Sequence, residues 1–308
     1  MLEGEAVTIL HICAGWEKSN GAANIARMMM GEQEAAGHSV VRRTWASIKE
    51  LRATDEVWIH CAWKPCLWWA AFWAKRYKWM PEASYDPVRL RYHGWKKKLA
   101  GFVERFFLRK AVCIVATCEA EKGWIEEYLG ARCPRIEITD IKRFFDLNPK
   151  GQGNQEKRDG GLFSSKERKV DEPLHLLYLG RRHPLKGLEY LEESIRNVKM
   201  GNCGNRQTGW GRIELRTVSS VFGEEKERVW AWSDVLVLPT LSENFGLVVA
   251  EALERGKRVI TTDGAPAWGD GNTYGGRLAY LAGYREGTPE IRVRLLEEAI
   301  VKVMKSVE

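Results

Sequence analysis

The segment Pro239–Leu253 carries the clearest chemical signal of the chain. An apolar helix is predicted to begin near Phe245, with Ser242 or Asn244 as its N-terminal cap. Glu251 stands inside the apolar part of this helix, and an unpaired buried carboxylate is strongly destabilising. Either a protein cation therefore pairs with Glu251, or the hydroxyl groups of a ligand reach it.

Glu243 precedes the same helix, where its carboxylate can accept hydrogen bonds from a polar ligand. The backbone N–H groups of residues 245–247 lie at the predicted helix start and can bind a phosphate. The alternative is structural: Glu243 would only start the helix, and Glu251 would be a paired core charge.

Two further clusters follow predicted strands. Residues 180–187 offer Arg181 and Lys186 beside a glycine turn, and two cations at a helix start suit a diphosphate. An ordinary basic surface loop is the alternative. Residues 261–266 end another strand with small side chains, which let the backbone approach a ligand.

Alternating strands and helices must position these clusters. The alternation predicts an α/β protein with parallel sheets covered on both faces, and the ligands of such sheets bind beyond the carboxyl ends of the strands. We expect domains at 1–148 and 173–308, joined by a polar, Gly-rich linker or mobile loop at 149–172. The predicted strands are 6–13, 39–42, 57–61, 111–117, 173–180, 213–218, 235–239 and 258–262, and the predicted helices are 22–36, 66–75, 94–110, 119–129, 187–198, 223–232, 246–255 and 289–306.

With these motifs the sequence resembles the retaining, nucleotide-sugar-dependent glycosyltransferases of family 4, the group 1 glycosyl transferases. That family has the GT-B fold, in which two Rossmann-like parallel-sheet domains face each other across a cleft. The resemblance is clearest over residues 173–275, and the subgroup it most resembles builds lipopolysaccharide core or other surface polysaccharides. It rests on Gly180-Arg181 with Lys186-Gly187, on Asp234–Pro239, on Glu243 and Glu251 with seven residues between them, and on Thr262–Pro266.

The resemblance implies a role for each of these residues. Arg181 and Lys186 would hold the diphosphate of a UDP-, GDP- or ADP-sugar, and Glu243 would bond the hydroxyls of the sugar. Glu251 would bond the ribose. Transfer would proceed with retention of configuration and without a metal or other cofactor, to a lipopolysaccharide-core, lipid-linked or polysaccharide acceptor. The remaining donor-site residues would be Gly180, Asn244, Phe245, Gly246 and Leu247, with Val221 and Phe222 at the base.

The first domain would be the acceptor side, and it departs from the family pattern. Its loop after the first strand is poor in glycine, and Gly21 either contacts phosphate or acceptor or belongs to a plain turn. Many relatives carry a histidine after a later strand, whereas the matching segment, Met80–Pro87, has none and offers Glu82 instead. His60, at the end of a predicted strand, is another candidate, although a lone histidine there is more often structural.

Residues 86–110 contain eight Lys or Arg and two acidic residues. Within them, Trp95–Lys110 mixes cations and large apolar side chains at helical spacing. This segment either docks on an anionic membrane surface or packs on the sheet with a solvated basic face.

Composition excludes several classes. The 308 residues carry a net charge of +7 and are 44% hydrophobic, which excludes a disordered chain and allows a sizeable core. No segment resembles a membrane span, and the acidic residues 1–5 do not resemble a signal peptide. Seven cysteines indicate free thiols in a reducing compartment, so we expect a cytoplasmic protein, with a peripheral position on the inner face of the cell membrane if the basic segment docks there. The spacing of Cys61/Cys66 and Cys113/Cys118 is compatible with zinc, but buried core thiols are the favoured interpretation.

Parts of the sequence could suit three other functions. The 14 tryptophans and basic charge could suit a nucleic-acid-binding protein, but no binding module is recognisable, so no nucleic acid is expected as a partner. A NAD-dependent oxidoreductase is disfavoured because the first turn is not G-x-G-x-x-G and strand 39–42 lacks the acidic residue. A non-catalytic relative that binds sugar nucleotides stays open.

Overall fold

The computed structural model describes residues 6–17, 20–92, 94–147, 173–201 and 213–305. The chain divides into two compact units, Met1–Phe144 and Phe145–Glu308. The predicted linker, 149–172, lies outside the described residues. Among the described helices, none has the length and apolar content that crossing a membrane requires.

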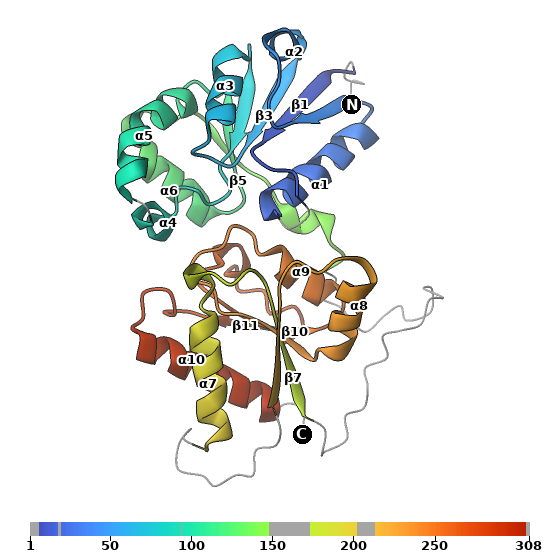
Figure 1. The fold of residues 1–308 in the computed structure, drawn as a ribbon, viewed down its shortest axis with the longest axis vertical. Coiled ribbons are helices and arrows are strands. Elements are labelled where there is room, and N and C mark those ends of the chain that lie inside the picture. The colour runs from blue at the N-terminus through green and yellow to red at the C-terminus, as the bar shows by residue number, and fades with distance from the viewer. Residues whose placement is uncertain (1–5, 18–19, 93, 148–172, 202–212, 306–308) are drawn as a thin grey trace. The chain divides into compact units, whose positions relative to one another are not determined.

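The first unit is built on a six-stranded sheet in the order β2-β1-β3-β4-β5-β6 (Figure 1). All of its strand pairs are parallel, because a helix connects most successive strands and returns the chain to the same edge. The strands are β1 (Thr8–Cys13), β2 (Ser39–Arg43), β3 (Glu56–His60), β4 (Tyr77–Met80), β5 (Cys113–Ala116) and β6 (Ile136–Ile138), and the helices are α1 (Gly21–Ala35), α2 (Ile48–Ala53), α3 (Pro65–Trp73), α4 (Pro87–Arg91), α5 (Gly94–Leu108) and α6 (Glu119–Leu129).

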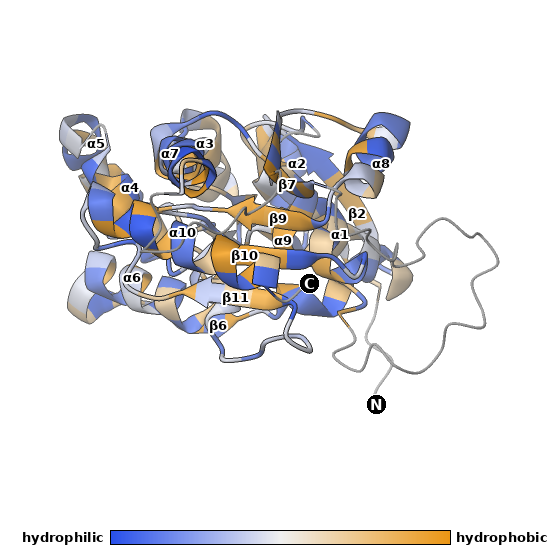
Figure 2. Ribbon diagram, turned by 90° about the horizontal axis from the view of Figure 1, so that it is seen from below, coloured by the Kyte–Doolittle hydropathy of each residue, from blue (hydrophilic) through white to orange (hydrophobic). Residues whose placement is uncertain are grey.

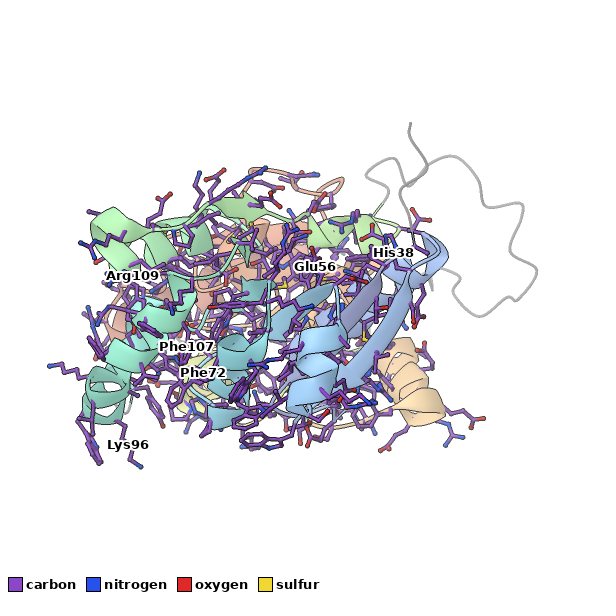
Figure 3. All side chains as sticks on the ribbon, turned by 90° about the horizontal axis from the view of Figure 1, so that it is seen from above. His38, Glu56, Phe72, Lys96, Phe107 and Arg109 are labelled. Atoms are coloured by element: carbon purple, nitrogen blue, oxygen red, sulfur yellow. The ribbon has the colours of Figure 1, made fainter. Side chains whose placement is uncertain are left out.

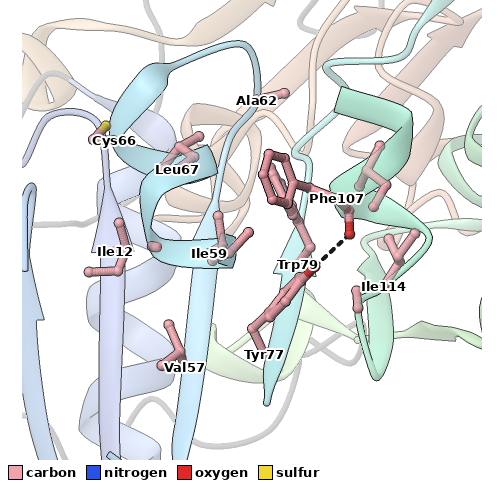
Figure 4. Packing of buried hydrophobic residues seen from close by; sticks show 14 of the residues in the cluster. Ile12, Val57, Ile59, Ala62, Cys66, Leu67, Tyr77, Trp79, Phe107 and Ile114 are labelled. Carbon is pink, nitrogen blue, oxygen red and sulfur yellow. Dashed lines mark hydrogen bonds between the residues drawn. The ribbon is translucent and has the colours of Figure 1, made fainter. Parts of the chain in front are cut away.

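The core of the first unit lies between this sheet and helices α3 and α5. Ile12, Ile59 and Trp79 are fully buried on three neighbouring strands (Figure 4). The hydroxyl of Tyr77 donates a 2.6 Å hydrogen bond to the carbonyl oxygen of Phe107, so the polar end of a buried ring is satisfied within the core.

The second unit contains a five-stranded parallel sheet in the order β11-β10-β9-β7-β8. Helices α7 and α10 pack together on one side of it, and α8 and α9 lie on the other (Figure 1). Figure 2 shows β9, whose four residues are all Val or Leu, as strongly hydrophobic, as a strand covered on both faces must be. The strands are β7 (Leu174–Leu179), β8 (Ile213–Val218), β9 (Val235–Leu238), β10 (Arg258–Thr262) and β11 (Leu278–Leu281), and the helices are α7 (Leu188–Lys199), α8 (Gly223–Trp232), α9 (Leu247–Glu254) and α10 (Pro289–Lys305).

The predicted α/β fold with two parallel sheets is confirmed. Strands β8 and β10 and helices α6 and α8 have the predicted bounds, and most other elements differ by one to a few residues at their ends. The sequence did not predict strands β4, β6 and β11 or helices α2 and α4, which have only three to six residues each and therefore show little periodicity.

Candidate functional site

The loops that follow β7, β9 and β10 meet at the carboxyl edge of the second sheet. The loop after β9 donates to the loop after β7, through Leu241 N to the Leu185 carbonyl at 2.8 Å. It also donates to the loop after β10, through Glu243 N to the Gly264 carbonyl at 2.7 Å. All three predicted clusters thus form one connected surface of the second unit.

Two glycines allow this close approach. Gly187 has a φ of +61°, and a Cβ added there would lie less than 3.0 Å from the carbonyl oxygen of Pro239. A Cβ added to Gly264 would come equally close to the carbonyl oxygen of Thr240. Backbone packs against backbone at both points, so the contacts admit no side chain.

Lys186 and Glu243, both predicted site residues, form an ion pair on this surface. Both side chains are largely but not fully buried, and Asn244 N donates to Glu243 Oε1 at 3.3 Å. Arg181 is exposed and lies in the same loop after β7 as Lys186. Its carbonyl oxygen accepts a 2.9 Å hydrogen bond from the Tyr178 hydroxyl. Gly180 closes the turn after β7 through its N–H to Val218 O at 2.9 Å.

The start of helix α9 differs from the prediction. Its N-cap is Gly246, which has a φ of +75° and no side chain to bond the first turn, so neither Ser242 nor Asn244 is the cap. Phe245 is buried against the ring of Trp268, whose indole N–H donates to the Phe245 carbonyl at 2.5 Å. The helix begins at Leu247, and the left-handed glycine leaves the N–H groups of its first turn without a side-chain cap.

Glu251 is not the deeply buried carboxylate that the apolar pattern predicted. Its side chain is 24% exposed and pairs with Lys226 of α8 at 2.7 Å. Of the two alternatives, a protein cation therefore does pair with it. Val221 is nearly buried and Phe222 is exposed, both in the loop after β8 at the same edge of the sheet.

In the first unit, His60 and Glu82 lie together at the carboxyl edge of the sheet. His60 Nδ1 lies 3.2 Å from Glu82 Oε1, and His60 Nε2 lies 2.9 Å from Nδ1 of His11. The other nitrogen of His11, Nε2, donates to Gln33 Oε1 at 2.7 Å. A hydrogen-bonded chain therefore runs from the partly exposed Gln33 through two buried histidines to the buried Glu82.

The protonation of this chain follows from its burial. Burial lowers the pKa of His60 to about 3, and burial with the nearby His60 lowers that of His11 to about 3, so both imidazoles are neutral. Burial and the neighbouring Glu121 raise the pKa of Glu82 well above its usual value. If Gln33 accepts from His11, then His11 accepts from His60, and His60 accepts from a neutral Glu82 carboxyl group. The raised pKa of Glu82 and the lowered pKa of His60 both favour a neutral hydrogen bond over an ion pair between them.

The backbone around Glu82 is strained. Glu82 and Ala83 have φ values of +56° and +57°, and Cys61, after β3, has +71°. Glu121 holds this loop, since its carboxylate accepts from Ala83 N at 2.5 Å and from Thr117 N at 2.8 Å. Strain that surrounding contacts maintain is typical of functional sites. Gly21, in contrast, begins α1 with open space where a Cβ would stand, and shows no close approach.

The sequence did not identify His11, Gln33 or Glu121. The available signal was the pair of histidines near the ends of two apolar strands. The parallel register pairs Cys13 with His60, which stacks the rings of His11 and His60 at 5.1 Å. No group of three or more potential metal ligands is found within the described residues, where Cys61, Cys66, Cys113 and Cys118 are free.

Parts of the sequence are similar to known proteins. Residues 173–281 match the family model described as "Glycosyl transferases group 1". The chain is 28% identical over 178 residues to an uncharacterized 41.2 kDa protein in the cps region of Klebsiella pneumoniae, covering 55% of this chain and 48% of that protein. It is 33% identical over 109 residues to a D-inositol 3-phosphate glycosyltransferase of Xylanimonas cellulosilytica, covering 30% and 26%. The chain thus spans about half or less of the length of these curated relatives.

Solved structures are similar over nearly the whole chain. Anabaena Alr3699/HepE, in complex with UDP and glucose, has a TM-score of 0.61 at 13% identity, covering 97% of this chain and 90% of that one. Sucrose-phosphate synthase from Thermosynechococcus elongatus has a TM-score of 0.59 at 14% identity, covering 98% and 95%. WaaG, described as a glycosyltransferase involved in lipopolysaccharide biosynthesis, has 0.55 at 12%, covering 96% and 91%. The fold is therefore GT-B, as the resemblance predicted, and the match to the group 1 glycosyl transferase model lies within the second unit.

Proposed function

We propose that this chain is a glycosyltransferase whose second unit binds a nucleotide-diphosphate sugar. The observation that carries the proposal is the Lys186–Glu243 pair, set where three loops meet at the carboxyl edge of the sheet. An ammonium group suits the diphosphate and a carboxylate suits sugar hydroxyls, so one pair offers both parts of the donor a partner.

The other donor-site residues take roles that fit their positions. Arg181 is exposed and would join Lys186 on the diphosphate, with the first turn of α9, from Gly246 and Leu247, on the same group. Glu251 would bond the ribose while keeping Lys226, because a carboxylate has acceptor sites for both. The loop holding Val221 and Phe222 would contact the base.

The proposed reaction is transfer with retention of configuration and without a metal. As the bond from the sugar to the diphosphate breaks, negative charge grows on the leaving phosphate. Arg181, Lys186 and the start of α9 supply positive charge there. Glu243 would orient the sugar through its hydroxyls, and the leaving phosphate would accept the proton of the attacking acceptor hydroxyl.

The first unit would receive the acceptor. Glu82 is fixed by His60 and by its strained loop, and because its one proton is donated to His60, its other carboxyl oxygen would accept a hydrogen bond from a sugar hydroxyl. A surface glycan or glycolipid is the proposed acceptor class, and the relative encoded in a cps region supports it.

Nucleotide binding tests the proposal most directly. We expect UDP, GDP or ADP to raise the melting temperature of the chain, and the matching nucleotide sugar to be hydrolysed slowly without acceptor. Lys186→Met should weaken binding at least about tenfold, because a charge-assisted contact is lost. Lys302→Met, which removes an exposed cation from α10, is the matched control. Nucleotide binding without hydrolysis or transfer would instead identify a non-catalytic sugar-nucleotide-binding protein, and no stabilisation by any of the three nucleotides would refute the donor site.

A further inference from the structure

Helix α5 is fixed to the first unit by its inner face. Glu104, fully buried on that face, accepts from the Tyr85 hydroxyl at 2.6 Å, from Trp63 N at 3.3 Å and from the indole of Trp68. Phe107 and Leu108 enter the core on the same side. These contacts fix the rotation of α5 about its axis, so the opposite face of the helix always points away from the core.

That opposite face is apolar, although it is directed to solvent. Trp95, Leu99, Phe102 and Phe106 follow one another at spacings of four, three and four residues and are 69%, 80%, 80% and 44% exposed. They form one stripe about 17 Å long along the helix. Phe72 of α3 is also exposed, at 62%, but its ring contacts Phe107 on the inner side of the helix and is not part of this stripe, and Figure 3 shows these two residues side by side.

The charges beside the stripe are all positive. Lys96, Lys98, Arg109 and Lys110 are exposed, and none of them forms an ion pair with the described part of the chain. Figure 3 shows Lys96 projecting outward from α5, whereas Arg109, which follows the helix, donates to the carbonyl oxygen of Leu129 at 2.7 Å. Glu104 is the sole acidic residue from 94 to 110 and points inward, so nothing on the outer face offsets the cations.

We propose that this face of α5, defined by Trp95, Leu99, Phe102, Phe106 and the four cations, docks on an anionic lipid surface. The stripe enters the headgroup region, and the cations contact lipid phosphates. Apolar area and unpaired positive charge on one helix are the two components of interfacial binding.

Other occupants match the face less well. A second copy of the chain would bring cations against cations, which is repulsive. A nucleic acid would pair with the cations but would leave Leu99 and Phe102 without apolar contacts. A convex helix surface also offers no groove for a peptide, whereas a lipid surface accommodates both the stripe and the charge.

Vesicle flotation of the full chain tests the proposal without donor or acceptor, so its outcome is independent of the proposed transfer activity. We expect binding to vesicles of phosphatidylcholine with phosphatidylglycerol, and little binding to phosphatidylcholine alone. Lys96→Glu with Lys98→Glu should lower the partition constant at least about 30-fold. Leu99→Gln with Phe102→Gln, which keeps every charge, should lower it at least about tenfold because both side chains insert.

A matched control changes an exposed apolar residue and an exposed lysine of the second unit: Met200→Gln with Lys302→Glu should leave binding unchanged. Circular dichroism checks that each variant is folded. Equal binding to neutral and anionic vesicles, or full binding by the Leu99/Phe102 variant, overturns the proposal. So does a dimer in solution that the Leu99/Phe102 variant abolishes, or binding to an oligonucleotide but not to vesicles.

Discussion

Gly187→Ala tests whether the meeting of the three loops positions the donor site. An alanine at this position must keep a φ of +61°, which costs roughly 1 kcal/mol. Its Cβ would also lie less than 3.0 Å from Pro239 O and 3.0 Å from the Tyr284 hydroxyl. Moving the packed backbone at Pro239 away from this Cβ costs about 1–3 kcal/mol more. The expected loss is therefore about 2–4 kcal/mol, or roughly 10 °C in the melting temperature of the second unit.

Gly201→Ala is the matched control. Gly201 also has a left-handed φ, +71°, but open space where a Cβ would stand, so this substitution adds strain without a clash. It should lower the melting temperature by only about 3 °C. Differential scanning fluorimetry compares the two variants, and calorimetric titration with the stabilising nucleotide compares their affinity. Because Gly187 directly follows Lys186, its variant should also lose at least about tenfold in nucleotide affinity. Equal melting shifts, or unchanged affinity in Gly187→Ala, would refute the close packing of these loops as the basis of the site.

Two further perturbations concern the first unit. Glu104→Ala leaves the Tyr85 hydroxyl and two other donors without their acceptor, so urea unfolding should show a free energy of unfolding that is lower by about 3–5 kcal/mol. Glu104→Gln keeps one acceptor oxygen and should lower it less, and equal losses in the two variants would contradict this account. Because the pKa of His60 is lowered to about 3, the unfolded chain takes up a proton below pH 6.5 that the folded chain does not, so the free energy of unfolding decreases as the pH is lowered. The raised pKa of Glu82 has the opposite effect above pH 4.5, because there the folded chain holds a proton that the unfolded chain has lost. Glu82→Gln removes the opposing proton and should steepen the fall between pH 6.5 and 4.5 by up to about 1.4 kcal/mol per pH unit, and an unchanged slope would show that Glu82 is ionised in the folded chain.

The parts of the fold that the sequence predicted well are those with strong local signals. Strand β10 and helix α8 were bounded correctly because apolar runs, glycines and turn residues mark their ends. The loops after β7, β9 and β10 could be placed together because parallel strands share a carboxyl edge. The pairing of Lys186 with Glu243 follows from that placement, although the sequence assigned the two residues to different parts of a ligand.

Side-chain partners on separate elements could not be predicted in the same way. Glu251 lies in an apolar helical pattern, but its exposure and its pairing with Lys226 depend on how α8 and α9 lie beside each other. The chain through His11 and His60 depends on the parallel register of β1 and β3, since a shift of one residue would turn one ring to the other face of the sheet. A sequence pattern fixes the period of each strand, but not the register between two of them.

The Lys186–Glu243 pair also indicates how the proposed donor would be recognised as a whole. Without ligand each charge has the other as its partner, so neither is left unpaired in a largely buried position. A diphosphate alone would draw Lys186 away and leave Glu243 without its cation, whereas a nucleotide sugar replaces both partners, with phosphate for Lys186 and hydroxyls for Glu243. A nucleotide diphosphate can therefore bind, but the exchange of partners is more favourable when the sugar is present as well. It follows that the sugar should contribute more to the affinity of the intact chain than to that of Glu243→Gln, in which no carboxylate charge is left unpaired.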